Sequence, residues 1–356
     1  MTWDPQRPYD ALPTLPPACE LETRSVLKAT IASRAALAEL DARSRALSNP
    51  AILVGTIPML EARASSEIEN IVTTTDELFV AAATDDGTPS TREALRYRHA
   101  LSTGLETLGT RPLTAATAGV VCAAIRGHDE GFRRGEVYIG DPATRRRIYT
   151  PPAGREALSA LLDNWSSYLN DADDVDPLVR MAVAHYQFEA IHPFSDGNGR
   201  TGRIMNVLML CDAGLLDLPL LYLSRYIIET KDDYYRLLLE VTSDGAWEPW
   251  LLYMLEGVRS TSVWTLGIVD RIEAVHREVV DTLRGVLGVV NQDFVELLMA
   301  RPYVRSVDVM SACGVSRPTA VKWIRLLENA GLVGEVSVGR NVLYLNKPLM
   351  KVLVAS

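Results

Sequence analysis

The stretch from residue 177 to residue 212 constrains the fold most, because it reads as two helices joined by a turn rich in glycine and charge. Asp176 is a plausible N-cap of the first helix and Pro177 occupies its first position. This helix leads into HPFSDGNGRTGR (192–203), and an apolar helix follows that ends near Gly214. The joining turn is poor as helix and poor as core, so the pattern predicts an anion site between two helices.

The residues of this turn suit a phosphate-bearing ligand. Backbone N–H groups at a helix start attract phosphate, and glycine lets the backbone approach it closely. Arg200 and Arg203 project from one side of the helix start, and guanidinium groups match phosphate oxygens. Asp196 is a hard oxygen ligand for Mg²⁺, and His192 could act as a general base near neutral pH. Together they indicate transfer of a phosphate-linked group from a nucleotide; a structural turn with a solvated Arg pair is the alternative.

The segment 192–203 matches the complete motif HxFx(D/E)GNGRxxR, so the chain resembles the Fic family. The resemblance implies a mainly α fold, in which a helical core carries a β-hairpin flap. It also implies a protein adenylyltransferase, which moves AMP from ATP to a Ser, Thr or Tyr hydroxyl with Mg²⁺. In this reading His192 deprotonates the hydroxyl, Phe194 anchors the loop and Asp196 binds Mg²⁺.

The resemblance extends to the nucleotide-binding residues. The anion hole and its flanks comprise Gly197, Asn198, Gly199, Arg200, Gly202 and Arg203, with the two arginines on the β- and γ-phosphates. One of Tyr234 and Tyr235 is expected to stack on the adenine, although aromatic residues in an apolar helix are usually core. Residues 136–151, with β-like runs at 137–139 and 147–149, resemble the flap on which a target protein docks by strand addition.

The segment SSEIEN (65–70) has two interpretations. Ser66 and Glu69 fit the helix-capping pattern S-x-x-E, which needs no function. Ser65, Glu69 and Asn70 also match the Fic inhibitory motif (S/T)xxxE(G/N). The carboxylate of Glu69 would then pair with Arg203 and block the seat of the γ-phosphate, so we also count Glu69 with the nucleotide site. In some relatives the same Glu helps to remove AMP, so a bifunctional, de-AMPylating enzyme is an alternative.

The tail from residue 288 to residue 356 differs in charge from the rest of the chain. It carries eight Lys and Arg and five Asp and Glu, a balance of +3, whereas the whole chain has a net charge of −9. A helix, a turn at Gly314, a second helix from Ser316 and a β-pair around Gly339 resemble a winged helix-turn-helix. The residues expected to face DNA are Ser316, Arg317, Thr319, Lys322 and Arg340. The alternative for this module is a protein-binding domain of the same fold. The alternative for the whole chain is a DNA-binding transcriptional regulator whose Fic domain senses nucleotide.

The length of 356 residues indicates more than one domain. We divide the chain into an N-terminal helical region (1–110), a Fic catalytic domain (111–260), a linker helix (261–287) and the winged helix-turn-helix domain (288–356). The four cysteines are scattered and the sequence has no signal-peptide pattern, which favours a cytoplasmic protein. No apolar run reaches about 18 residues, so we expect no membrane segment. We also expect self-modification and a homodimer.

Overall fold

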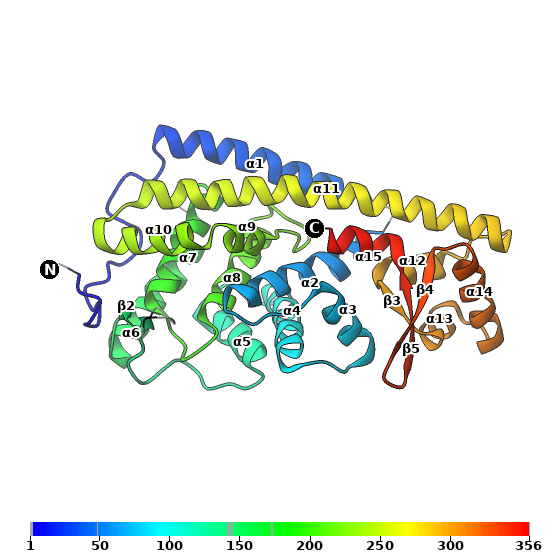
Figure 1. Cartoon of the computed structure of the whole chain (residues 1–356). Helices are drawn as coiled ribbons and strands as arrows, with labels where there is room; N and C mark the ends of the chain where they lie inside the picture. Colours follow the sequence, from blue (N-terminus) through cyan, green and yellow to red (C-terminus); the bar gives the residue numbers. More distant parts are fainter. Residues whose placement is uncertain (1–2, 48, 141–143, 145, 172–173, 356) are drawn as a thin grey trace.

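The computed structural model describes residues 3–355 apart from residues 48, 141–143, 145, 172 and 173. Within these residues it contains fifteen helices and five short strands, which confirms the mainly α fold (Figure 1). The helices are α1 (Arg24–Arg45), α2 (Ala51–Ile68), α3 (Thr75–Thr84), α4 (Pro89–Leu108), α5 (Ala115–Arg126), α6 (Arg155–Asn170), α7 (Pro177–Ile191), α8 (Asn198–Asp212), α9 (Leu223–Glu229), α10 (Lys231–Asp244), α11 (Trp247–Leu287), α12 (Gln292–Ala300), α13 (Ser306–Cys313), α14 (Arg317–Asn329) and α15 (Lys347–Val354). The strands are β1 (Ile139–Gly140), β2 (Arg147–Tyr149), β3 (Tyr303–Val304), β4 (Val333–Val338) and β5 (Asn341–Asn346).

The helices α7 and α8 form the centre of the molecule. The carboxylate of Asp176 accepts a hydrogen bond from the N–H of Leu178 at 2.9 Å, and Pro177 is the first helical residue, as predicted. Nearly every side chain of α7 and α8 is buried, so neither helix has a solvent face. Because such helices cannot move independently of their neighbours, the loop that joins them starts and ends on rigid elements.

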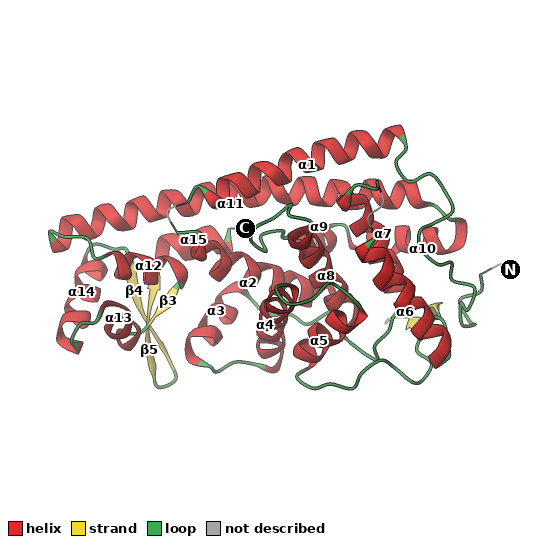
Figure 2. Cartoon of the chain, turned by 180° about the vertical axis from the view of Figure 1, so that it is seen from behind, coloured by secondary structure: helices red, strands yellow, loops and turns green. Residues whose placement is uncertain are grey.

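Helix α11 is 41 residues long and runs along most of the molecule, with α1 beside part of its length (Figures 1 and 2). The boundary predicted between residues 260 and 261 falls inside this helix. Val258, Thr261, Ser262 and Thr265 are all buried, so the packed side of the helix continues across that point. The sequence shows no helix-breaking signal there either, and residues 261–287 continue the same packed helix.

The C-terminal module begins at α12 and contains the helix–turn–helix and β-pair expected from the sequence. Gly314 has a φ of 63° and turns the chain between α13 and α14, and Ser316 is the N-cap of α14. Strands β4 and β5 pair antiparallel around Gly339, and β3 joins the other edge of β5. The helix–turn–helix and the three-stranded sheet thus form one C-terminal module.

Two hydrophobic cores share helix α2. Ala62 and Ile68 of α2 belong to the core around α7 and α8, whereas Leu53 and Leu60 belong to the core that includes α11 and the C-terminal module. Helix α2 therefore connects the two parts of the molecule by packing. Among the described helices, none combines the length and the apolar character that a membrane span requires.

Candidate active site

The loop between α7 and α8 is shaped by its own residues. His192 has a left-handed φ of 49°, which ends α7 and directs the chain into the loop. The side-chain oxygen of Asn198 accepts a hydrogen bond from the N–H of Phe194 at 2.8 Å, and its amide nitrogen donates to the Phe194 carbonyl at 2.8 Å. The Asn198 side chain is thus occupied in holding the loop, whereas the N–H groups of the first turn of α8 have no partner within the helix.

Two further side chains fix this loop to its surroundings. Phe194 is buried and stacks on Phe132 with ring centroids 5.5 Å apart, as expected for the anchor of the loop. Arg133 donates hydrogen bonds to the carbonyl of His192 at 2.8 Å and to the carbonyl of Pro152 at 2.5 Å. Arg133 therefore joins the loop to the base of the hairpin. No motif in the sequence marks this residue, because its partners are backbone carbonyls far from it along the chain.

The start of α8 brings two buried guanidinium groups to the loop. Gly197 caps the helix with a φ of 85°, a conformation that glycine adopts without strain. Arg200 is 3% exposed and pairs with Glu93 of α4 and, at 3.4 Å, with Asp196. Arg203 is 2% exposed and projects one turn further along. Glu93 thus holds Arg200 from another helix, and no pattern in the sequence marks it.

Arg203 makes its contacts with the end of α2. Its guanidinium donates to the Ser65 hydroxyl at 2.8 Å, to the Ser65 carbonyl at 2.9 Å and to the Glu69 carboxylate at 2.9 Å. Burial alone would raise the pKa of Glu69, but the charge of Arg203 outweighs it and the pKa lies below its ordinary value. A Cβ at Gly199 would collide with the Glu69 carboxylate, so glycine is what lets Glu69 approach the start of α8. The expected contact between Glu69 and Arg203 is present.

The interpretation of Ser66 and Glu69 as a helix-capping box is wrong. That pattern belongs to the start of a helix, whereas Glu69 is the C-cap at the end of α2. Asn70 follows with a left-handed φ of 62°, and the N–H of Ile71 donates to the Ser66 carbonyl at 3.0 Å. This is a Schellman termination, in which Gly and Asn are favoured at the left-handed position. The Asn of the motif therefore ends the helix directly after the carboxylate.

The acid–base groups beside the loop have shifted pKa values. Burial lowers the pKa of His192 to about 4, so its imidazole is neutral at pH 7. Its Nδ1 is buried, which leaves Nε2 as the nitrogen that can accept a proton from outside. Burial raises the pKa of Glu189, three residues earlier in α7, to about 8. A Cβ at Gly202 would lie 2.6 Å from a Glu189 carboxylate oxygen, so Gly202 packs against α7 at this position.

Asp196 supplies one carboxylate at the mouth of the loop. Its side chain is 66% exposed, and within the described ranges no group of three His, Cys, Asp or Glu side chains gathers to hold a metal ion. A single carboxylate suits Mg²⁺ that takes its other ligands from nucleotide phosphates and water. The donor set at Asp196 fits such an ion.

The two tyrosines of α10 differ in their surroundings. Tyr234 is 2% exposed, and its hydroxyl lies 2.7 Å from Nε2 of His185, so it is a core residue and cannot stack on a base. Tyr235 is 42% exposed. Burial raises the pKa of its hydroxyl, and the charges of Glu69 and Arg203 have smaller, opposite effects on that pKa. Of the pair, Tyr235 has the accessible ring. Lys231 of the same helix donates to the Ile68 carbonyl at 2.7 Å and so holds the end of α2.

The hairpin is shorter than the sequence suggested. Its first strand is Ile139–Gly140, so Val137 lies outside it, and Ile139 faces Tyr149 across the pair. The guanidinium of Arg147 lies over the ring of Tyr138 at 4.6 Å. The predicted flap residues 141–143 and 145 lie outside the described residues.

Family models match three parts of the chain. A model of the Fic/DOC family N-terminal region matches residues 27–106, and the Fic/DOC family model matches residues 121–210. A model of the protein adenylyltransferase SoFic-like C-terminal domain matches residues 277–349. This third match begins inside α11, which agrees with the absence of a break near residue 260.

Curated relatives match mainly the catalytic part. The chain is 35% identical over 125 residues to the protein adenylyltransferase fic-1 of Caenorhabditis briggsae, and 33% identical over 132 residues to the protein adenylyltransferase Fic of Aedes aegypti. These matches cover 35% and 36% of this chain but only 22% and 23% of the relatives, so the chain spans less than a quarter of their length.

Solved structures share the fold over a longer range. A Fic family protein from Desulfovibrio desulfuricans superimposes with a TM-score of 0.55 at 22% identity, covering 91% of this chain and 96% of that one. Fic-1 from C. elegans gives a TM-score of 0.53 at 19% identity, covering 69% and 74%. The loop with its complete motif, the three matching models and the shared fold agree, and the chain belongs to the Fic/DOC family.

Proposed function

We propose that the protein is an adenylyltransferase, which transfers AMP from ATP to a hydroxyl side chain of a protein, itself included. The observation that carries this proposal is the loop from His192 to Arg203, where a neutral imidazole stands beside the start of α8 and two buried guanidinium groups. A protein that only senses nucleotide needs the anion site but not the base. The names of the relatives support the same activity.

In the proposed reaction the start of α8 holds the phosphates of ATP. The free N–H groups of the first helical turn receive phosphate oxygens, with Arg203 on the γ-phosphate and Arg200 beside it. Asp196 would hold Mg²⁺, which when bound neutralises phosphate charge. Nε2 of His192 accepts the proton of the target hydroxyl, the oxygen attacks the α-phosphorus and pyrophosphate leaves. We assign the adenine contact to Tyr235, because its ring is the accessible one of the pair.

The contact of Glu69 with Arg203 restrains this reaction in our proposal. It occupies the guanidinium that the γ-phosphate requires, and the carboxylate also lies against Gly199. Nucleotide can still bind, but its α-phosphate is turned away from in-line attack. Incubation with ATP labelled at the α-phosphate is the test: if neither the protein nor a cell lysate gained label, even with Glu69→Gly, the proposed activity would be wrong.

The pH dependence of the reaction should reflect the low pKa of His192. Since its pKa is about 4 rather than 6.5, the neutral base is fully present at pH 7 and is lost only as the pH falls through about 4. We expect kcat/KM of the Glu69→Gly protein to be flat from about pH 5.5 to pH 8, because kcat/KM reports the free enzyme. An acidic limb centred near 6.5 would contradict the buried, neutral base.

We also propose that the target protein docks on the flap, that the protein is cytoplasmic and that it forms a homodimer. The short pair of β1 and β2 supports docking by strand addition, because an extended target segment can continue such a hairpin. The four cysteines are free thiols, which is compatible with a reducing compartment.

A second candidate function is DNA binding by the C-terminal module. Arg317, Lys322 and Arg325 are exposed along α14, beside the helix surface formed by Pro318 and Val321. In a winged helix-turn-helix the second helix enters the major groove, and α14 holds that position. This row of cations is the observation that favours DNA over a purely protein-binding module.

The DNA proposal predicts a steep dependence of affinity on salt. Arg317→Ala and Lys322→Ala should each weaken binding to genomic fragments and lower the salt slope by about one, since each removes one phosphate contact. Arg236→Ala on α10 is the matched control and should change neither quantity. Binding that ignores salt, or no binding to any fragment, would leave the module as a protein-binding domain.

A further inference from the structure

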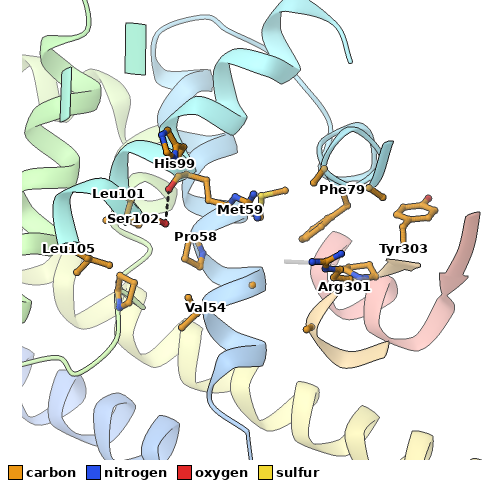
Figure 3. Close-up of a pocket in the computed structure, with 17 residues that line it drawn as sticks. Val54, Pro58, Met59, Phe79, His99, Leu101, Ser102, Leu105, Arg301 and Tyr303 are labelled. Carbon is orange, nitrogen blue, oxygen red and sulfur yellow. Dashed lines mark hydrogen bonds between the residues drawn. The ribbon is translucent and has the colours of Figure 1, made fainter. Parts of the chain in front are cut away.

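A pocket outside the candidate active site lies where α2 and α4 meet the start of the C-terminal module. In Figure 3, Met59, Pro58 and Val54 follow one another along α2, with His99 of α4 at the top and Arg301 to the right. The pocket has a volume of about 540 Å³, within the range of small-molecule sites. None of the residues from His192 to Arg203 lines it. It is therefore separate from the nucleotide site proposed above.

Two exposed arginines line this pocket. Arg98 comes from α4 and Arg301 follows α12, and no Asp or Glu is among the described residues that line the cavity. In the part of the chain that the structure describes, neither guanidinium makes a hydrogen bond or an ion pair. The pocket is thus cationic in a chain whose net charge is −9.

The charge of Arg301 acts on Arg98 at this pocket. Partial burial lowers the pKa of Arg98, and the charge of Arg301 lowers it further. Both causes act against the charged form of the side chain. An anion between the two groups would reverse the second effect and satisfy their N–H donors. A planar guanidinium offers paired donors that match the oxygens of phosphate.

The remaining wall of the pocket is largely apolar. Phe79, Met59, Leu101 and Leu105 line it together with several prolines, and Phe79 lies on the same side as Arg301 in Figure 3. An apolar wall next to paired cations suits a ligand with one charged end and one apolar or aromatic part. We propose that this pocket binds a small molecule that carries a phosphate group on an apolar or aromatic body.

The position of the pocket adds to the argument. A Cβ at Gly55 would lie 2.8 Å from the Ala300 carbonyl oxygen, so α2 and the end of α12 are in close backbone contact beside the cavity. Pro58 lacks an N–H and leaves the Val54 carbonyl without its helical partner at the same place. The site is therefore built from a rigid contact between two parts of the molecule rather than from a mobile surface loop.

Thermal unfolding of the full chain tests this proposal, with phenyl phosphate and inorganic phosphate as probes. At about tenfold excess over its Kd, phenyl phosphate should raise Tm by roughly 2 °C. Inorganic phosphate should have a smaller effect, because it lacks the aromatic part. Arg98→Gln and Arg301→Gln should each abolish the rise. Without ligand, Arg98→Gln should unfold at the same temperature as the unmodified protein or at a higher one, because a repulsion has been removed.

Matched controls separate this pocket from the nucleotide site. Arg111→Gln changes an exposed arginine just beyond α4 and should leave the response to phenyl phosphate intact. If both Arg98→Gln and Arg301→Gln kept the full response, the phosphate would be bound at α8 and the proposal would be wrong. It would also be wrong if sodium chloride of equal ionic strength, or a dicarboxylate alone, produced the shift. Because Tm is measured, the result does not depend on adenylyltransferase activity.

Discussion

Glu69→Gly is expected to increase self-modification with AMP by on the order of 10²-fold at saturating ATP. The carboxylate of Glu69 lies 2.9 Å from a guanidinium nitrogen of Arg203, in the place that the γ-phosphate requires. Its removal lets the triphosphate bind with the α-phosphate in line for attack. A misplacement of the reacting groups by about 1 Å can by itself reduce the rate by about 10²-fold. The measurement is incorporation of label from ATP labelled at the α-phosphate.

Three further variants define this prediction. Glu67→Gly introduces the same flexibility into the last turn of α2 but removes a carboxylate that pairs with Arg63, so it should not activate. Arg203→Ala should be inactive, since it removes the phosphate seat together with the restraint. The double variant of Glu69→Gly and Arg203→Ala should be as inactive as Arg203→Ala. If Glu69→Gly left the rate unchanged, the contact would serve only to end α2.

His192→Ala is expected to reduce transfer by roughly 10²–10⁴-fold in the Glu69→Gly background, while the affinity for ATP stays nearly unchanged. The imidazole acts on the incoming hydroxyl, whereas the phosphates are held by the start of α8 and its arginines. The measurement compares the rate of label incorporation with the Kd for ATP from a direct titration.

The control for this prediction is His128→Ala, which removes an exposed imidazole that lies beside Glu130. It should alter neither the rate nor the affinity. An equal loss of affinity and rate in His192→Ala would show that the side chain maintains the loop, whose backbone turns at this residue with a φ of 49°.

The local features of the site could be predicted because they depend on neighbouring residues. Asp176 and Pro177 start α7 as expected, and Gly197 caps α8. The end of α2 could not be predicted in the same way, since Ser66 and Glu69 fit a pattern typical of a helix start. Only the tertiary structure shows that Asn70 in a left-handed conformation ends the helix there.

Contacts between distant residues account for what sequence reasoning missed. Arg133 binds backbone carbonyls of the loop, and Glu93 pairs with Arg200 from another helix, and neither role leaves a local pattern. The choice between Tyr234 and Tyr235 depends on which one His185 contacts across the core. The predicted boundary between residues 260 and 261 rests on motifs, whereas the buried side of α11 continues across it without interruption.

The unbroken length of α11 has a mechanical consequence. At 1.5 Å per residue, a helix of 41 residues is about 60 Å long, so a tilt of about 5° at one end displaces the other by about 5 Å. Because the C-terminal module and α2 pack into the same core as α11, we expect a tilt of the module to reach α2, the helix that ends at Glu69.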